Sequence, residues 1–109
     1  MGSTMTPAAL AKIKLEISQL RGSSRKSVQL ERVAERLGRK LATRGKHPTW
    51  QNGEFPGLIS LSIPHHSRDL PRKTVEDILD HLINNDVLAW DQRLEPDILD
   101  ASTIISIIN

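Results

Sequence analysis

Hydrophobic residues near the start of the chain recur every three or four positions, which is the spacing of one buried face of an α-helix. They are Leu10, Ile13, Ile17 and Leu20. Thr6 is a favourable cap, and Pro7 fits the first helical position because no partner is needed there for its missing N–H. The pattern predicts a helix over residues 7–20, which the turn beginning at Gly22 should end.

A second amphipathic pattern follows, with Ser27 as the candidate cap and Gly38 as the expected stop. Its apolar face consists of Leu30, Val33, Ala34 and Leu37. The basic residues at helical spacing on another face are Arg32, Arg36 and Arg39. This stripe has two open interpretations: an anion-binding surface, or a solvated helix face on which Glu35 pairs with Arg39.

The middle third changes to short β-forming segments separated by turn signals. We expect an antiparallel meander of three strands over residues 41–44, 49–51 and 58–63. A turn at Gly45-Lys46 joins the first two strands, and a longer turn over 52–57 joins the last two. Such a sheet is typical of a small domain that mixes helices and strands.

The parity of the strand residues predicts which face of the sheet is buried. Ile59, Leu61 and Ile63 alternate with serines in the last strand, so these three side chains should face the core. His47 and Trp50 have opposite parity, which places Trp50 in the core and His47 facing away from it.

A third helix is expected after a loop that contains His65 and His66. Its apolar face consists of Val75, Ile78, Leu79 and Leu82, and Asn84-Asn85-Asp86 should end it. Residues 87–90 could then form a strand. The apolar positions from 98 to 108 fit a helix or a strand, and they either pack on the domain's own core or contact a partner.

These elements predict an α+β fold with an α-β-β-β-α core over residues 27–85. An extra N-terminal helix precedes the core, and a C-terminal appendage over 86–109 follows it. Residues 6–109 are expected to form one domain. Residues 1–5 are expected to be a disordered segment left over from cloning, because Met-Gly-Ser-Thr precedes a second methionine, Met5.

Charge is distributed unevenly although the net charge is only +2. Residues 25–46 contain eight basic and two acidic residues, whereas residues 76–100 contain eight acidic residues and one arginine. This asymmetry either steers a polyanion to one face or holds the two halves together within the fold.

Several classes of chemistry are excluded or disfavoured by composition. The chain has no cysteine, so disulfides, thiolate zinc sites and a cysteine nucleophile are ruled out. No apolar run is long enough to cross a membrane and no signal peptide is visible, so we expect a cytoplasmic protein. The adjacent His65 and His66 lack a carboxylate cluster at ligand spacing, so no metal site and no cofactor are expected.

The basic segment ends beside a histidine, His47, which can exchange protons near neutral pH. Arg44 and Lys46 flank it and could hold a phosphate. Arg72 and Lys73 open the third helix, where cations oppose the helix dipole but free amides and positive charge suit a phosphate. The alternatives are an exposed turn histidine before Pro48 and ordinary surface charge.

Several short motifs together resemble the HicA family of toxin–antitoxin ribonucleases. They are Gly45-Lys46-His47, the aromatic Trp50, Ile63-Pro64-His65 and Lys73-Thr74-Val75. They are similar in order and spacing to the family's Gly-Ser-His motif, its Val-Pro-His strand end and its Gly-Thr-Leu helix start. The match covers residues 30–82, and Lys46 and Lys73 replace the family's serine and glycine.

The resemblance implies a double-stranded-RNA-binding-domain-like fold and a metal-independent endoribonuclease that cleaves mRNA. It assigns the catalytic role to His47. Arg44, Lys46, His65, Arg72 and Lys73 are then the candidate RNA-binding residues. A cognate antitoxin protein would be the partner, and the oligomeric state stays open.

Two other classes of function remain possible from the sequence. One is a non-catalytic nucleic-acid-binding module, either winged-helix or double-stranded-RNA-binding-domain-like. In the winged-helix form, the third helix, residues 87–90 and a later apolar segment would together read DNA. An interaction domain could instead bind a protein through the acidic C-terminal half and its apolar end.

Overall fold

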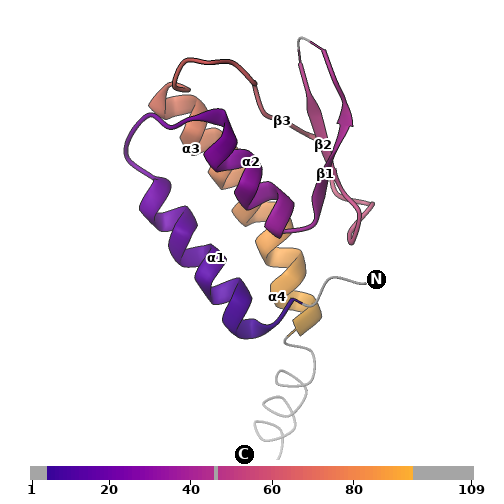
Figure 1. The fold of residues 1–109 in the computed structure, drawn as a ribbon. Coiled ribbons are helices and arrows are strands. Elements are labelled where there is room, and N and C mark those ends of the chain that lie inside the picture. The colour runs from indigo at the N-terminus through magenta and orange to yellow at the C-terminus, as the bar shows by residue number, and fades with distance from the viewer. Residues whose placement is uncertain (1–4, 46, 95–109) are drawn as a thin grey trace, which may run out of the picture.

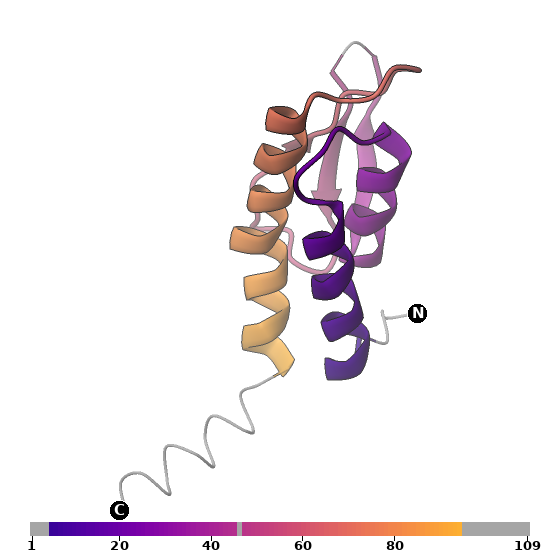
Figure 2. The ribbon, with the colours of Figure 1, turned by 90° about the vertical axis from the view of Figure 1, so that its left-hand side faces the viewer.

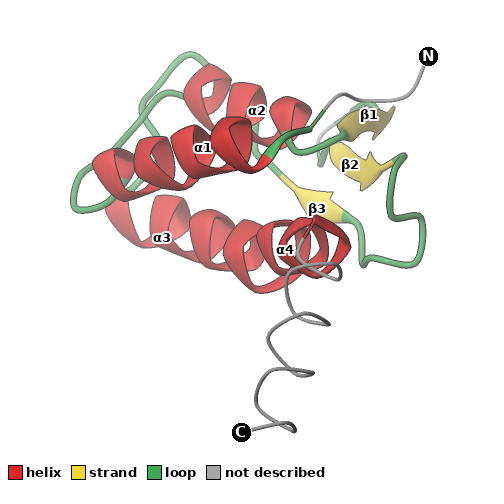
Figure 3. Cartoon of the chain, turned by 90° about the horizontal axis from the view of Figure 1, so that it is seen from below, coloured by secondary structure: helices red, strands yellow, loops and turns green. Residues whose placement is uncertain are grey.

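All the helices of this protein lie on one side of an antiparallel sheet, and α1 (Pro7–Leu20) is the one farthest from it (Figures 1 and 3). The computed structural model describes residues 5–45 and 47–94. The element order includes the predicted α-β-β-β-α succession, preceded by one extra helix. The α+β class and the three-stranded antiparallel sheet are therefore confirmed.

The first helix, α1 (Pro7–Leu20), has the predicted bounds. The Thr6 hydroxyl accepts a hydrogen bond from the Ala9 N–H at 3.1 Å, as expected of a cap. All four apolar positions of the predicted face are buried, and the helix packs against α2 and α4. Local pattern and tertiary packing agree here.

The second helix, α2 (Ser27–Arg36), begins differently from the prediction. Ser27 is not its cap, because the Ser27 hydroxyl donates to the Pro64 carbonyl at 2.7 Å. Lys26 takes the cap position instead, and its N–H donates to the Gln29 side-chain oxygen at 2.9 Å. The serine thus joins α2 to the segment that follows the last strand.

Gly38 ends this part of the chain as predicted and turns it into the sheet. Its φ of 104° is unfavourable for residues with a side chain. A Cβ atom at this position would lie 2.9 Å from the Asn52 Oδ1. Glycine is therefore required both by the turn and by the close approach of Asn52.

The sheet has the order β1-β2-β3, with β1 (Arg39–Thr43), β2 (Thr49–Asn52) and β3 (Leu61–Ser62). Trp50 faces the helices, as predicted. The last strand is shorter than expected, and Ile59, predicted to be buried, is 72% exposed. The Ile59 carbonyl accepts a hydrogen bond from the Arg39 guanidinium at 3.0 Å, which draws this residue out of the strand pairing.

The third helical region continues well past the predicted stop at residues 84–86. It comprises α3 (Arg72–His81), the π-helical turn η1 (Leu82–Val87) and α4 (Leu88–Leu94). The strand predicted over 87–90 is therefore wrong. Trp90, within that stretch, donates from Nε1 to the Leu37 carbonyl at 2.7 Å, so α4 is anchored to the end of α2. The predicted apolar end over 98–108 lies outside the described residues.

The helix continues past the predicted stop because the Asp86 carboxylate binds Arg39 and Asn52 instead of backbone N–H groups near it in the chain. Arg39 donates from Nε and Nη2 to the two Asp86 carboxylate oxygens, each at 2.8 Å. Asn52 donates to the same carboxylate at 2.8 Å. All three side chains are buried, and the π turn is the kind of local widening that re-aims a residue in a helix.

This network also corrects the predicted basic stripe on the second helix. Arg39 lies in β1 and does not pair with Glu35. Arg36 pairs with Glu16 of α1. Two of the three arginines are therefore engaged within the fold, which favours a structural role for that part of the stripe.

Other ion pairs join the N-terminal half to the acidic half. Arg21 donates to Glu76 at 2.8 Å and to Asp80 at 2.7 Å, and Lys14 pairs with Asp91 at 2.8 Å. The Gly22 N–H and the Arg21 guanidinium hold the pKa of Glu76 below its ordinary value. Arg21 and Lys14 lie before the basic segment over 25–46. Of that segment's described residues, Arg39 alone forms an ion pair with the acidic segment over 76–100.

Within the described residues, no helix combines the length and the apolar character that crossing a bilayer would require.

Replacing Asp86 with alanine should lower the free energy of unfolding by about 3–5 kcal/mol, because Arg39 would keep a buried charge without its counter-ion. Urea unfolding followed by circular dichroism measures this change. Asp91→Ala, in α4 of the same helical region, is the matched control. It removes the partly exposed Lys14–Asp91 pair, and such a pair contributes about 1 kcal/mol or less to the free energy of unfolding. Equal losses in the two variants would contradict the central role of the buried pair.

The Glu76 contact should make stability depend on acid pH. A carboxylate whose pKa is lowered by folding stabilises the native state above the unfolded pKa, about 4.3 for glutamate. That contribution disappears as the pH falls through the lower folded pKa. The melting temperature of the wild type should thus fall more steeply than that of Glu76→Gln as the pH drops below about 4.3. Parallel melting curves would exclude this contribution.

Candidate nucleic-acid interface

Most of the residues predicted to bind or cleave RNA lie at one end of the molecule. The β1–β2 connection and the start of α3 occupy the same end in two perpendicular views (Figures 1 and 2). The predicted residues described there are Arg44, His47, His65, Arg72 and Lys73, and all five are exposed. Lys46 lies outside the described residues. This end therefore presents cations and imidazoles from three separate segments.

A β-bulge decides which way the end of β1 faces. Leu41 pairs with Trp50 but Thr43 pairs with Thr49, so the register shifts by one residue between them. The alternation of faces is reversed by that shift. Arg44 consequently lies on the same side as Leu41 and Trp50, and it lines a pocket with both of them.

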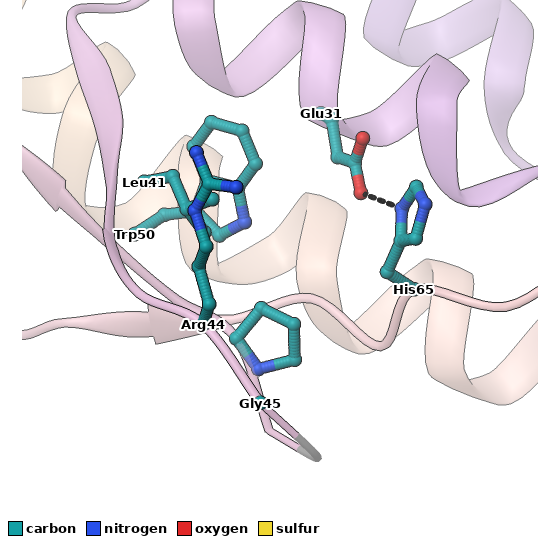
Figure 4. A pocket seen from close by; sticks show the side chains of 7 residues that line it. Glu31, Leu41, Arg44, Gly45, Trp50 and His65 are labelled. Atoms are coloured by element: carbon teal, nitrogen blue, oxygen red, sulfur yellow. Dashed lines mark hydrogen bonds and ion pairs between the residues drawn. The ribbon is translucent and has the colours of Figure 1, made fainter.

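The pocket has a volume of about 370 Å³ and opens beside the β1–β2 connection. Leu41, Pro48 and Trp50 give it apolar walls. Figure 4 shows the Arg44 side chain on one side of the hollow and the side chains of Glu31 and His65 on the other. Its size is in the range of small-ligand sites.

Glu31 and His65 form the shortest polar contact in the pocket wall. The His65 Nδ1 lies 2.7 Å from a Glu31 carboxylate oxygen. The Glu31 side chain is only 12% exposed, whereas that of His65 is 66% exposed. Because a carboxylate accepts, Nδ1 carries the proton in this pair. The other ring nitrogen, Nε2, remains for a ligand.

Trp50 lines the same pocket, and its indole carries a donor without a partner. Trp50 is only 7% exposed. Its Nε1 is the one buried side-chain nitrogen or oxygen, among the described residues, without a hydrogen-bond partner. A buried N–H of this kind usually has a partner. The nitrogen itself is buried, so it is not open to a ligand in this structure.

His47 is exposed, as its parity predicted, but it is not among the residues lining the pocket. The Ile63 N–H donates to the Pro48 carbonyl at 3.3 Å, which extends the antiparallel pairing of Thr49 with Ser62. Both histidines lie outside the strands, His47 in a bend before β2 and His65 after β3. Of the two, His65 lines the pocket and His47 does not.

Arg72 and Lys73 open α3 with both side chains exposed. No side chain caps this helix, so its first amides face outward together with two cations. Nearby, Lys26 pairs with Asp69 at 2.9 Å. The start of α3 thus keeps an excess of positive charge.

Within residues 5–45 and 47–94, no group of three or more histidine, cysteine or acidic side chains is placed to hold a metal ion. The structure brings two predicted residues, Arg44 and His65, into one pocket. Glu31 was not singled out by the sequence. Its partner lies 34 residues away, so no local signal could have identified the pair.

Comparison with protein-family models, with curated proteins and with solved structures gave no match to this chain.

Replacing Arg72 and Lys73 together with glutamine should weaken RNA binding and flatten its salt dependence. If each cation neutralises one phosphate, the slope of log affinity against log salt should fall in magnitude by about 1.4 for single-stranded RNA. Fluorescence anisotropy over a salt series measures this slope. Lys12→Gln, which removes an exposed cation of α1, should leave the slope unchanged. An identical slope in the double variant would exclude phosphate contacts at α3.

Proposed function

We propose that this protein is a HicA-like toxin, a metal-independent endoribonuclease that cleaves mRNA with His47 and is neutralised by a cognate antitoxin. The observation that supports this proposal most directly is the exposed imidazole of His47, which lies at the same end of the molecule as Arg44, Arg72 and Lys73 (Figures 1 and 2). A polyanion bound across that end would pass next to a group able to exchange protons near neutral pH.

The arrangement of the core supports a double-stranded-RNA-binding-domain-like fold. The order α2-β1-β2-β3-α3 and the sheet order β1-β2-β3 are those expected from the resemblance. The helices lie on one face of the sheet, which leaves the other face open. Basic residues at the start of the last helix are used by such domains to contact RNA phosphates.

The reaction needs no metal ion in this scheme. His47 acts as general base or acid at the 2′-hydroxyl or the leaving oxygen, and histidine suits either role. Arg44 and Lys46 bind the phosphate and stabilise the charge that develops on it. The products are a 2′,3′-cyclic phosphate and a 5′-hydroxyl.

The winged-helix and interaction-domain alternatives receive less support. The winged-helix interpretation required a strand over residues 87–90, and this segment belongs to the helical region that ends in α4. The interaction-domain interpretation required free acidic side chains. Glu76, Asp80 and Asp86 are each bound to an arginine within the fold.

His47→Ala should lower the rate of RNA cleavage in EDTA by about 100-fold or more, because general acid–base catalysis contributes at least that factor. A labelled transcript incubated with purified protein measures the rate, and inhibition of growth on expression gives a second readout. His66→Ala removes another exposed histidine and should keep the wild-type rate. Wild-type cleavage by the His47 variant would overturn the proposed catalytic role.

A further inference from the structure

We propose that His65, held by Glu31, is the second proton-transfer residue and protonates the leaving 5′-oxygen of a phosphodiester bound in the Arg44 pocket. This inference depends on the proposed ribonuclease function and names the acid that complements His47. It assigns the pocket to one scissile phosphate and the nucleotide that follows it.

The Glu31–His65 pair fixes the imidazole in the orientation that this role needs, and the acid is the imidazolium form with protons on both ring nitrogens. The carboxylate accepts from Nδ1 at 2.7 Å, so the opposite nitrogen, Nε2, is directed away from Glu31. Glu31 is largely buried whereas His65 is mostly exposed. The acid therefore has a fixed inner contact and an outer nitrogen that RNA can reach. Glu31 is a positioning residue in this scheme.

The remaining pocket wall has the composition expected for a nucleotide. Arg44 lies across the hollow from the Glu31–His65 pair (Figure 4) and supplies a guanidinium for phosphate oxygens. The apolar surfaces of Leu41 and Pro48 suit a sugar or a base.

An in-line reaction requires the two histidines to act from different directions. In an in-line displacement, the attacking and leaving oxygens are on opposite sides of phosphorus, so base and acid must approach from opposite sides. His65 lines the pocket, whereas His47 lies outside it, next to the pocket residue Pro48. In this proposal an RNA backbone that passes over Pro48 meets His65 inside the pocket and His47 outside it.

The proton balance is complete without another reactant. Neutral His47 removes the 2′-hydroxyl proton as the 2′-oxygen bonds to phosphorus. The bond from phosphorus to the 5′-oxygen breaks, and the proton on His65 Nε2 goes to that oxygen. His47 ends protonated and His65 neutral, and proton exchange with water restores both.

A substrate with a better leaving group tests this role directly. The probe is a short RNA oligonucleotide whose mapped cleavage site carries sulfur in place of the bridging 5′-oxygen, compared with the all-oxygen oligonucleotide. A thiolate leaves without protonation. His65→Ala should therefore slow cleavage of the oxygen substrate by about 100-fold and that of the sulfur substrate only a few-fold. His47→Ala should slow both.

Three other results have distinct meanings. Equal slowing of both substrates by His65→Ala overturns the acid role in favour of binding alone. A wild-type rate for His65→Ala on the oxygen substrate removes His65 from the reaction. Wild-type protein that cleaves neither the oligonucleotide nor a transcript overturns the ribonuclease function itself.

Glu31 should follow the same pattern as His65, with a smaller loss. Glu31→Ala should slow the oxygen substrate about 10-fold, within the effect of misplacing a catalytic group, and spare the sulfur substrate. Glu31→Gln keeps an oxygen that can accept from Nδ1 and should restore most of the rate. Glu35→Ala, an exposed acid one turn further along α2, should behave as wild type. Equal loss on both substrates in Glu31→Ala would overturn the positioning role.

Discussion

The buried ion pair between Arg39 and Asp86 joins the sheet to the helical layer, and the rest of the fold depends on it. Two buried charges are tolerated only when their hydrogen-bonding groups are satisfied. Arg39 meets this condition because all five of its N–H groups are used, by Asp86, by the carbonyls of Trp50 and Ile59, and by His81. Since arginine cannot accept, the His81 Nε2 is the acceptor. The pair fixes the position of β1, and Arg44, the residue directly after this strand, lines the pocket.

Local patterns predicted the elements whose stability is local. The bounds of α1, the turn at Gly38 and the antiparallel meander follow from periodicity, capping and turn residues. The errors lie where a distant partner outweighs a local preference. Asp86 belongs to a sequence that normally ends a helix, yet Arg39, 47 residues away, holds it inside the helix. Ser27 likewise bonds across the fold instead of capping α2.

The sequence predicted which basic residues and histidines belong to the candidate site. It did not predict how they are brought together. Arg44, His65 and the start of α3 were identified because positive charge and imidazoles suit phosphate chemistry wherever they occur. Their grouping required the bulge in β1 and the pairing of Glu31 with His65. Neither has a signature in the sequence, since one depends on strand register and the other on two elements meeting in space.

The bulge in β1 makes the identity of the pocket wall depend on chain length as well as on residue type. Ala42 is the extra residue of this bulge, and the alternation of faces resumes after it. One residue inserted between Thr43 and Arg44 would turn Arg44 toward the opposite face of the sheet, because successive residues of a strand face opposite sides. A single-codon insertion there would thus exchange the lining of the pocket without altering any of the side chains that form it.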